Sequence, residues 1–524
     1  MLFNTPQYIR FLPIVVLIYY CLPKKVRYIW LLCVSYYFYM RWNPLYITLL
    51  FSCTLLTFVS GRILERFNQS SGSKNIENAA DHDEIIIQIR KKKKVCLVVC
   101  ILLNLGILVY FKYFNFGIMC LNRLLHIFRM NEIDRSFDIL LPVGISFYTL
   151  QALGYLIDVY RGDIYAEKNF LKYALFVSFF PQLVAGPIER SKNLLVQLQK
   201  QHPFQYDNLR KGWLLVLYGL FLKMVIADRA AIIVDTVYNS ESYQGFYIVI
   251  ATFFFAIQIY CDFYGYSTIA RGSALLMGIR LMDNFAAPYY SKSVKEFWRR
   301  WHISLSGWFR DYLYIPLGGN KKGRIRKESN LFTVFAISGL WHGAAVSFIF
   351  WGILNGVYQI VGDWFHDVKH FISRQRSTIL QKLNLENTDI DKNMVETFSK
   401  KAFQTIGTFC LITFSWLFFR AGDMRTACRM IVNIFRVNNW TIFFDGSLYD
   451  LGVASNYMFV LIMSIFILFI VDYQKYKGRD VSAWLLKQGW LLRVPIYMFF
   501  IFTILLYGCY GEIYDIQQFI YFQF

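Results

Sequence analysis

Apolar runs long enough to cross a lipid bilayer recur along the whole chain, with short polar segments between them. One crossing needs about 20 consecutive apolar residues. Runs of this kind begin near Phe11, Tyr28, Leu45, Val95, Leu171, Trp213, Tyr247, Leu331, Phe403, Phe459 and Val494. The pattern predicts an all-α polytopic membrane protein with about 11 or 12 transmembrane helices, folded as a single membrane domain over residues 1–524.

Three segments depart from this pattern. Residues 62–94 are polar and end in five consecutive basic residues, so we predict a long loop there. Residues 141–160 contain Pro142 and Gly144, which favours a broken or re-entrant segment surrounded by protein. Residues 366–401 mix both charge signs with few apolar residues, and we predict a polar insert with surface helices on the cytoplasmic side.

Charge refines the topology. The chain has 524 residues, is 56% hydrophobic and carries a formal charge of +21, but its basic residues lie mostly in short segments between apolar runs. This distribution argues against nucleic-acid binding and favours anionic membrane lipids as neighbours. Basic residues at 24–27 and 90–94 fall on one side of the membrane, which the positive-inside rule makes cytoplasmic. We therefore expect both the N-terminus and the C-terminus outside.

One histidine stands alone in an apolar stretch. Residues 331–362 contain no Asp, Glu, Lys or Arg, and His342 lies in the middle, flanked by Gly339, Gly343 and Ala344. An ionisable residue at membrane depth is a functional candidate by default, and small neighbours let another helix or a thin substrate approach closely. A buried neutral imidazole is a suitable general base for a hydroxyl. The alternative is a neutral histidine that only hydrogen-bonds a neighbouring helix.

A second cluster lies at residues 296–312. If the segment is one helix, its aromatic residues form one stripe and its polar residues another: Trp298, Trp301, Leu305, Trp308 and Tyr312 against Arg299, His302, Ser306 and Arg310. An interfacial helix would explain the aromatic stripe and the arginines, but not His302 beside two serines. The basic residues at 321–327 could contact a nucleotide phosphate or anchor the chain at the cytoplasmic surface.

Several other groups remain open. Glu189 and Arg190 end a segment broken by two prolines, where local ion pairing is expected. Asp228 and Asp262 lie near the ends of apolar runs, and each could orient a histidine or cap a helix. The ten cysteines show no zinc spacing, so we expect them to pack rather than bind a metal.

These motifs resemble the membrane-bound O-acyltransferase (MBOAT) family, in its bacterial branch concerned with alginate O-acetylation. The matching stretches are densest over residues 141–362: Gly186-Pro187-Ile188-Glu189-Arg190, Gly265-Tyr266-Ser267, Asn284-Phe285, the run from Trp298 to Asn320, and Trp341-His342-Gly343, with a later match at Phe414-Ser415-Trp416-Leu417-Phe418-Phe419-Arg420-Ala421. Tyr264 departs from the pattern, where a small residue is expected.

The resemblance implies a helical fold around a central funnel or tunnel with His342 as the catalytic residue. It implies that His302 is a second catalytic histidine on the cytoplasmic side. Asp228 matches less closely, in a Lys-x-x-x-Ala-Asp-Arg stretch. We expect Asp228, Ser306, Arg299 and Trp341 to support the two histidines.

The last residues also resemble a known motif. Phe519-Ile520-Tyr521-Phe522-Gln523-Phe524 is similar to the tail of the small partner used in D-alanyl transfer to teichoic acids. The resemblance implies that Tyr521 could relay an acyl group. The alternative is a tail that only packs its aromatic residues at the membrane interface.

The function that these observations favour is acetyl transfer from a cytoplasmic thioester, acetyl-CoA, towards an extracellular polysaccharide, in the cytoplasmic membrane of a bacterium. No bound cofactor or metal is expected. The resemblance implies an extracellular acetyl-esterase-like partner that finishes the transfer. The alternatives are D-alanyl-type transfer from a carrier-protein thioester, a polysaccharide or lipid transporter without chemistry, and a scaffold for a secreted acyltransferase.

Overall fold

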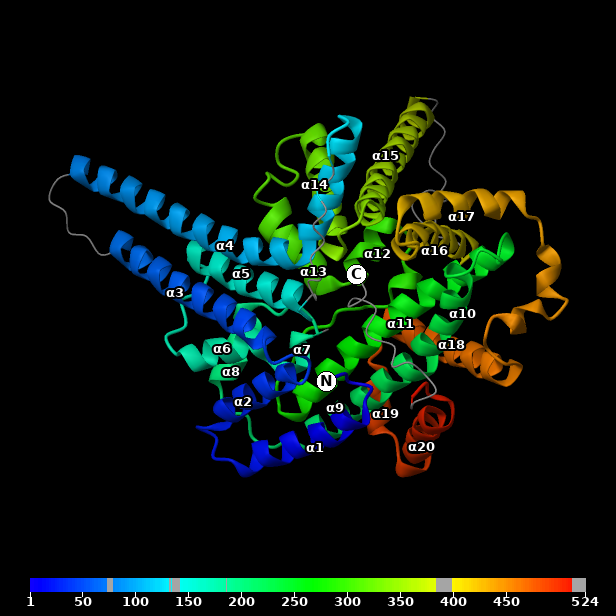
Figure 1. Ribbon diagram of the computed structural model, residues 1–524, viewed down its shortest axis with the longest axis horizontal. Helices are drawn as coiled ribbons and strands as arrows, with labels where there is room; N and C mark the ends of the chain where they lie inside the picture. The colour runs from blue at the N-terminus through cyan, green and yellow to red at the C-terminus, as the bar shows by residue number, and fades with distance from the viewer. Residues whose placement is uncertain (73–78, 132, 134–141, 185, 383–397, 511–524) are drawn as a thin grey trace. The chain divides into compact units, whose positions relative to one another are not determined.

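The computed structural model describes residues 1–72, 79–131, 133, 142–184, 186–382 and 398–510 (Figure 1). All regular structure in these ranges is helical, which confirms the all-α prediction. The first half of the chain contains α1 (Pro6–Cys21), α2 (Arg27–Met40), α3 (Tyr46–Gly72), α4 (Ala79–Ile127), α5 (Ile145–Arg161), α6 (Phe170–Ser178), α7 (Phe180–Leu183), α8 (Ser191–Gln199), α9 (Tyr206–Leu220), α10 (Asp228–Tyr238) and α11 (Phe246–Leu276). The second half contains α12 (Val294–Arg300), α13 (Ile303–Phe309), α14 (Arg324–His342), α15 (Val346–Lys382), α16 (Phe398–Arg420), α17 (Met424–Arg436), α18 (Ser455–Tyr476), α19 (Val481–Lys487) and α20 (Trp490–Tyr507).

Within the described ranges, six helices are long and apolar enough to cross a membrane. They are α3, α4, α11, α16, α18 and α20, and α1 is a shorter apolar helix. The protein is therefore a multi-pass membrane protein. The remaining predicted crossings fall on helices that are shorter or more polar, so the total of 11 or 12 and the central tunnel stay predictions.

The chain forms two compact units, each assembled from separate stretches. The first unit comprises Met1–Val225, Cys261–Asp283 and Ser482–Phe524. The second comprises Ile226–Tyr260 and Asn284–Val481, and it contains both candidate histidines. Each unit is described below by itself.

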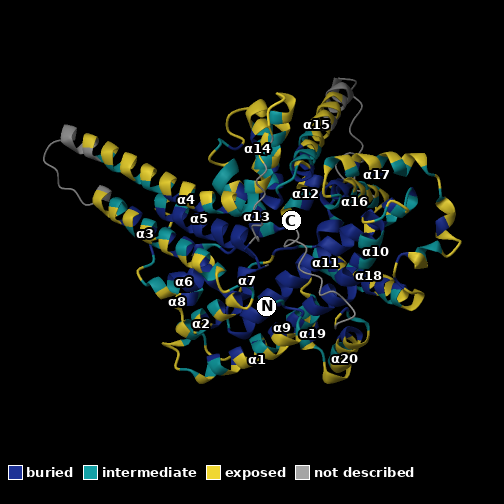
Figure 2. Cartoon of the chain, viewed as in Figure 1, coloured by how far each residue is buried: buried dark blue, intermediate teal, exposed yellow. Residues whose placement is uncertain are grey.

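In the first unit, α3, α4 and α5 pack against one another (Figure 1). Helix α5 is buried along most of its length (Figure 2). Residues 145–161 form one uninterrupted helix, because Pro142 and Gly144 precede its first turn. The prediction of a broken segment is therefore wrong, and a re-entrant segment stays a prediction. Gly144 has φ +76°, and a Cβ there would lie 2.6 Å from the carbonyl oxygen of Leu183. Only glycine fits this entry to the helix.

Both polar segments are helical where the structure describes them, although a loop was predicted for residues 62–94. Helix α3 continues to Gly72 and α4 begins at Ala79, so the basic run at 90–94 lies on a helix rather than in a long loop. Residues 366–382 continue α15 as a helix, and the cytoplasmic polar insert over residues 366–401 stays a prediction. Residues 73–78 and 383–397 lie outside the described ranges.

A buried ion pair stands where α9 continues into a wide π-helical stretch, Phe221–Ala227. Lys223 Nζ lies 2.7 Å from Asp262 Oδ1, and the two side chains are 1% and 3% exposed. The backbones approach closely beside this pair, since a Cβ on Gly219 would lie 2.7 Å from the carbonyl oxygen of Gly265. Asp262 therefore binds a lysine of the first unit, a partner that the sequence pattern did not suggest.

Candidate active site

His342 is the last residue of α14, at the turn of a tight helical hairpin formed with α15. A Cβ on Gly339 would lie 2.2 Å from the carbonyl oxygen of Phe348, and one on Gly352 would lie 2.2 Å from that of Phe335. Glycine at both positions lets the two backbones touch. The expectation that small residues near His342 admit another helix is confirmed, and that helix is α15.

The imidazole of His342 lies inside an aromatic cage, which we define as Trp341, Trp351 and Phe419. The ring centroids are 5.0 Å from Trp341, 5.1 Å from Trp351 and 5.5 Å from Phe419, all at steep interplanar angles. The residue is 4% exposed. Edge-to-face contacts on several sides fix the plane of the ring. Phe419 comes from the late motif at 414–421, so this distant motif contributes directly to the site.

His302 stands at a break between two short helices. Helix α12 ends at Arg300 and α13 begins at Ile303, so the prediction of one helix through residues 296–312 is wrong. His302 has φ 43° and ψ 54°, the left-handed region that side chains other than glycine rarely adopt. Such strain in a non-glycine residue concentrates at functional sites.

Packing of Trp301 explains the break. Its indole stacks on Phe297 at 5.3 Å and lies 5.2 Å from Trp416, and only 1% of the residue is exposed. Trp301 therefore belongs to the protein core and does not face lipid as an interfacial stripe would require. The chain turns sharply after it, and the next side chain, His302, is carried into the interior at 1% exposure.

Asn284 sets the tautomer of His302. The backbone N–H of Ser304 donates to Asn284 Oδ1 at 3.3 Å, and the Ser304 hydroxyl donates to the same atom at 2.9 Å. Because that atom accepts, it is the amide oxygen, and the Nδ1–H of His302 donates to it at 3.2 Å. In the neutral ring Nε2 is then the accepting nitrogen.

Burial keeps the imidazole of His302 neutral. Removal from solvent lowers the pKa of its imidazole from 6.5 to about 3, because a buried imidazolium loses its hydration. Together, burial keeps the ring neutral and the hydrogen bond to Asn284 places its proton on Nδ1. This is a group that can accept a proton or a hydrogen bond at neutral pH.

Trp341 joins the two histidines. Its indole lies 6.3 Å from the His302 ring and 5.0 Å from the His342 ring, measured between centroids. The structure thus brings together three of the predicted site residues, which are 40 positions apart in the sequence at their extremes. The Trp341 indole lies between His302, which has left-handed backbone angles, and His342, which ends α14.

The other predicted site residues stand as follows. Ser306 donates to the carbonyl oxygen of Trp301 at 3.3 Å, and Ser304 is the serine at the His302 ring. Arg299 is exposed on α12, and Asp228 is buried at the first position of α10. Tyr521 lies outside the described residues.

Sequence reasoning missed the residues that support the two histidines. Asn284 was noted only as part of a family motif, and Trp351 was not singled out. The loop that carries Asn284 is held in turn by Lys475, whose ammonium donates to the carbonyl oxygen of Phe285. Nearby, the Tyr260 hydroxyl donates to the buried Asp472 Oδ2 at 2.6 Å. Asn284 beside an aromatic residue was the only local signal for this support.

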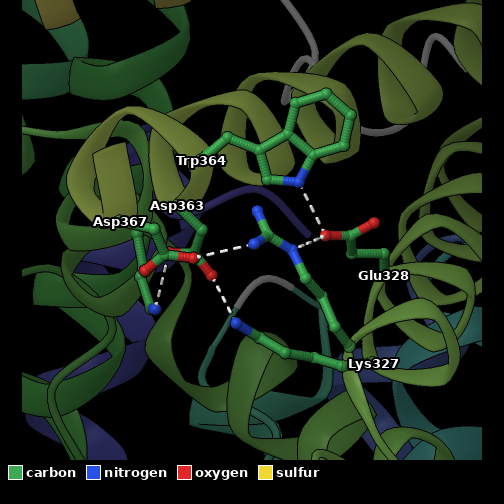
Figure 3. A network of polar contacts seen from close by, with 7 residues as sticks. Lys327, Glu328, Asp363, Trp364 and Asp367 are labelled. Atoms are coloured by element: carbon green, nitrogen blue, oxygen red, sulfur yellow. Dashed lines mark hydrogen bonds and ion pairs between the residues drawn. The ribbon is translucent and has the colours of Figure 1, made fainter. Parts of the chain in front are cut away.

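A polar network ties α14 to α15 far from His342 along the hairpin (Figure 3). Lys327 donates to Asp363 Oδ2 at 2.6 Å, and Trp364 donates to Glu328 Oε1 at 2.7 Å. Arg324 contacts Glu328 at 2.9 Å and Asp367 at 3.2 Å. Two of the basic residues in the segment 321–327 therefore stabilise the hairpin through carboxylates of this chain.

Glu189 has a hydrogen-bonding role. Its carboxylate accepts from the side-chain amide of Asn193 at 2.6 Å and from the backbone N–H of Met282, two residues before Asn284. Burial raises the pKa of Glu189 to about 7, although these hydrogen bonds oppose the rise. The glutamate of the 186–190 motif thus fixes the backbone of the first unit at Met282.

The chain thus combines an integral-membrane helical fold with two buried histidines that contact the same indole, that of Trp341. Residues 166–378 match the model of the membrane-bound O-acyltransferase family. A protein of Pseudomonas putida described as a probable alginate O-acetylase is 35% identical over 432 residues, covering 82% of this chain and 79% of its own length. The chain belongs to the membrane-bound O-acyltransferase family, and it is an O-acyltransferase.

Two further relatives show the breadth of the similarity. A peptidoglycan O-acetyltransferase of Helicobacter pylori is 30% identical over 471 residues, covering 84% of this chain and 80% of its own length. A teichoic acid D-alanyltransferase of Bacillus subtilis is 30% identical over 255 residues, covering 45% of this chain and 64% of its own length. The family-model match contains Glu189, Asp228, His302 and His342, so the resemblance that these motifs suggested is confirmed.

Proposed function

We propose that this enzyme transfers an acetyl group from a thioester on the cytoplasmic side to an extracellular polysaccharide, with His342 as the general base. The observation that carries the proposal is the buried imidazole of His342 inside its aromatic cage, with neutral His302 across the indole of Trp341. The two O-acetylating relatives above are named for acetyl transfer to alginate and peptidoglycan, which supports acetyl as the acyl group and a polysaccharide as the acceptor.

The reaction balances without a redox partner. The hydroxyl of the acceptor gives its proton to the imidazole of His342, and its oxygen attacks the thioester carbonyl carbon. The tetrahedral intermediate collapses with loss of the thiolate, which takes the proton from His342 and leaves as a thiol. An ester and a free thiol are formed. His302, with its proton on Nδ1, offers Nε2 as an acceptor that holds a donor N–H or O–H of either substrate.

The finer features of the proposal rest on the sequence. The thioester is acetyl-CoA, the membrane is the bacterial cytoplasmic membrane, and both termini lie outside. Asp228, Ser306 and Arg299 support the histidines. Tyr521 relays the acyl group, and an extracellular acetyl-esterase-like protein completes the transfer. D-alanyl-type transfer is the second candidate, favoured only by the shorter similarity to the D-alanyltransferase.

The ester content of cell-surface polysaccharide tests the proposal. His342→Ala is expected to abolish O-acetyl ester formation while the protein still accumulates in the membrane. His366→Ala removes an exposed histidine from α15 and serves as the matched control with unchanged ester content. If the protein were a transporter or a scaffold, the ester content of the polysaccharide would be unchanged in His342→Ala at equal protein level.

A further inference from the structure

The first unit contains a cavity of about 190 Å³ whose walls are strongly basic. It opens where α1, α2, α6 and the end of α8 meet. Six of its lining residues carry or can carry positive charge: Lys24, Lys25, Arg27, Lys172, Lys200 and His202. The remaining lining residues are aromatic, aliphatic or amide, so the wall contains no carboxylate.

The side chain of Arg27 lines the cavity and is held in place by several partners. Its guanidinium donates to the carbonyl oxygens of Tyr20, Leu22 and His202, at 3.2, 3.0 and 2.8 Å. It also lies over the ring of Tyr19, 5.0 Å from the centroid. These partners orient the guanidinium but are neutral, so its positive charge remains uncompensated within the cavity.

The lysines are arranged around this fixed charge. Lys172 lies 5.6 Å over the ring of Tyr28, and Lys24, Lys25 and Lys200 are exposed. Within the described part of the chain, none of these four ammonium groups forms a salt bridge. One carboxylate touches the rim, because Gln199 donates to Glu167. Like charges held this close together favour an anionic ligand.

The position of the cavity indicates the source of the anion. Lys24 and Lys25 form the turn between two apolar helices, on the side predicted to be cytoplasmic. Apolar side chains beside this turn are exposed: Leu17 is 67%, Val26 38% and Ile29 38% exposed. A ligand in the cavity can thus present a charged group to the lysines and apolar chains to α1 and α2.

We propose that this cavity binds the phosphate group of an anionic phospholipid. The phosphodiester would lie between Arg27 and the four lysines, which supply charge-assisted hydrogen bonds from several directions. The acyl chains would cover the exposed apolar residues of the two helices. The proposal is independent of the acyl-transfer chemistry, because none of the cavity residues belongs to the histidine site.

Lipid retention tests this site. The full-length protein is reconstituted in nanodiscs of phosphatidylglycerol and phosphatidylcholine, and retained lipid is measured by native mass spectrometry. The test variant is Lys24→Gln/Lys25→Gln/Lys200→Gln. The control is Lys91→Gln/Lys92→Gln/Lys94→Gln, which removes the same charge from exposed positions of α4 outside the cavity. We expect preferential retention of phosphatidylglycerol in the wild type and the control, and about tenfold weaker retention in the test variant.

Three outcomes would overturn the proposal. They are equal retention of both lipids by the wild type, equal loss in the test and control variants, and displacement of phosphatidylglycerol by millimolar inorganic phosphate, which would make free phosphate the ligand. If the triple variant does not fold, Lys200→Gln alone decides the question, because this exposed residue follows α8 and its loss should weaken retention several-fold.

Discussion

The imidazole of His302 meets the indole of Trp341 at an interplanar angle of 65°, with 6.3 Å between the ring centroids. Trp341 directly precedes His342, and its indole also contacts that ring. Any displacement of the indole therefore moves the surroundings of both histidines together. This shared contact gives the site its geometry.

Trp341→Ala should lower kcat by about 100-fold, because a displacement of about 1 Å can cost this much when reacting groups must be aligned. Trp341→Phe keeps a ring and should retain more activity than Trp341→Ala. Both are measured as acyl transfer by purified protein at matched amounts. Equal activity in Trp341→Ala and the wild type would remove the indole from the mechanism.

Asn284→Asp should change the pH profile of activity. In the wild type the pKa of His302 is lowered to about 3, so His302 stays neutral as the pH falls from about 8 to 5 and causes no loss of activity in that window. A carboxylate at position 284 favours the imidazolium and raises this pKa. The charged ring cannot accept, so the variant should lose activity as the pH falls through the raised pKa.

The profile of acyl transfer against pH checks this prediction. Asn456→Asp makes the same chemical change at an exposed position of α18 and should leave the wild-type profile unchanged. Identical profiles for Asn284→Asp and the wild type would show that the amide does not control His302.

Gly339→Ala should destabilise the α14–α15 hairpin. The new Cβ would lie 2.2 Å from the backbone oxygen of Phe348, which cannot move without separating the helices. Overpacking of this kind costs about 1–3 kcal/mol of unfolding free energy. Gly362→Ala in α15 has no atom within 4 Å of its new Cβ and should be neutral or slightly stabilising. Thermal unfolding in detergent distinguishes them, and equal transitions would contradict the packing argument.

The ion pair between Lys223 and Asp262 predicts strong coupling. Lys223→Met or Asp262→Leu alone leaves one buried charge without its partner and should cost about 3–5 kcal/mol. The combination Lys223→Met/Asp262→Leu should recover most of this loss, because well-packed apolar residues can replace a buried pair. Membrane yield and thermal unfolding of the four proteins complete the double-mutant cycle. Additive losses in the double variant would mean that the two residues stabilise the protein independently.

The sequence predicted the parts of this site that have a local signal. His342 stands out because its apolar run contains no Asp, Glu, Lys or Arg, and apolar length alone predicts the six helices that are long enough to cross a membrane. The break at His302 could not be predicted in this way, because the stripe from Trp298 to Tyr312 satisfies a continuous helix. What breaks it is the burial of Trp301 against Trp416, a contact across more than a hundred residues. The link between Asn284 and His302 spans only 18 positions, but it joins two separate segments, so no helix or strand period in the sequence indicates it.

The stacked indoles of Trp351 and Trp416 also give the site an intrinsic spectroscopic signal. Their centroids are 5.4 Å apart and their planes are inclined by 22°, close enough for the two chromophores to couple electronically. The resulting near-ultraviolet circular dichroism depends on their mutual orientation. Since the His342 imidazole lies 5.1 Å from the Trp351 indole at an interplanar angle of 89°, a ligand that displaces this imidazole should change the signal before any product forms. Occupancy can thus be followed without a labelled substrate.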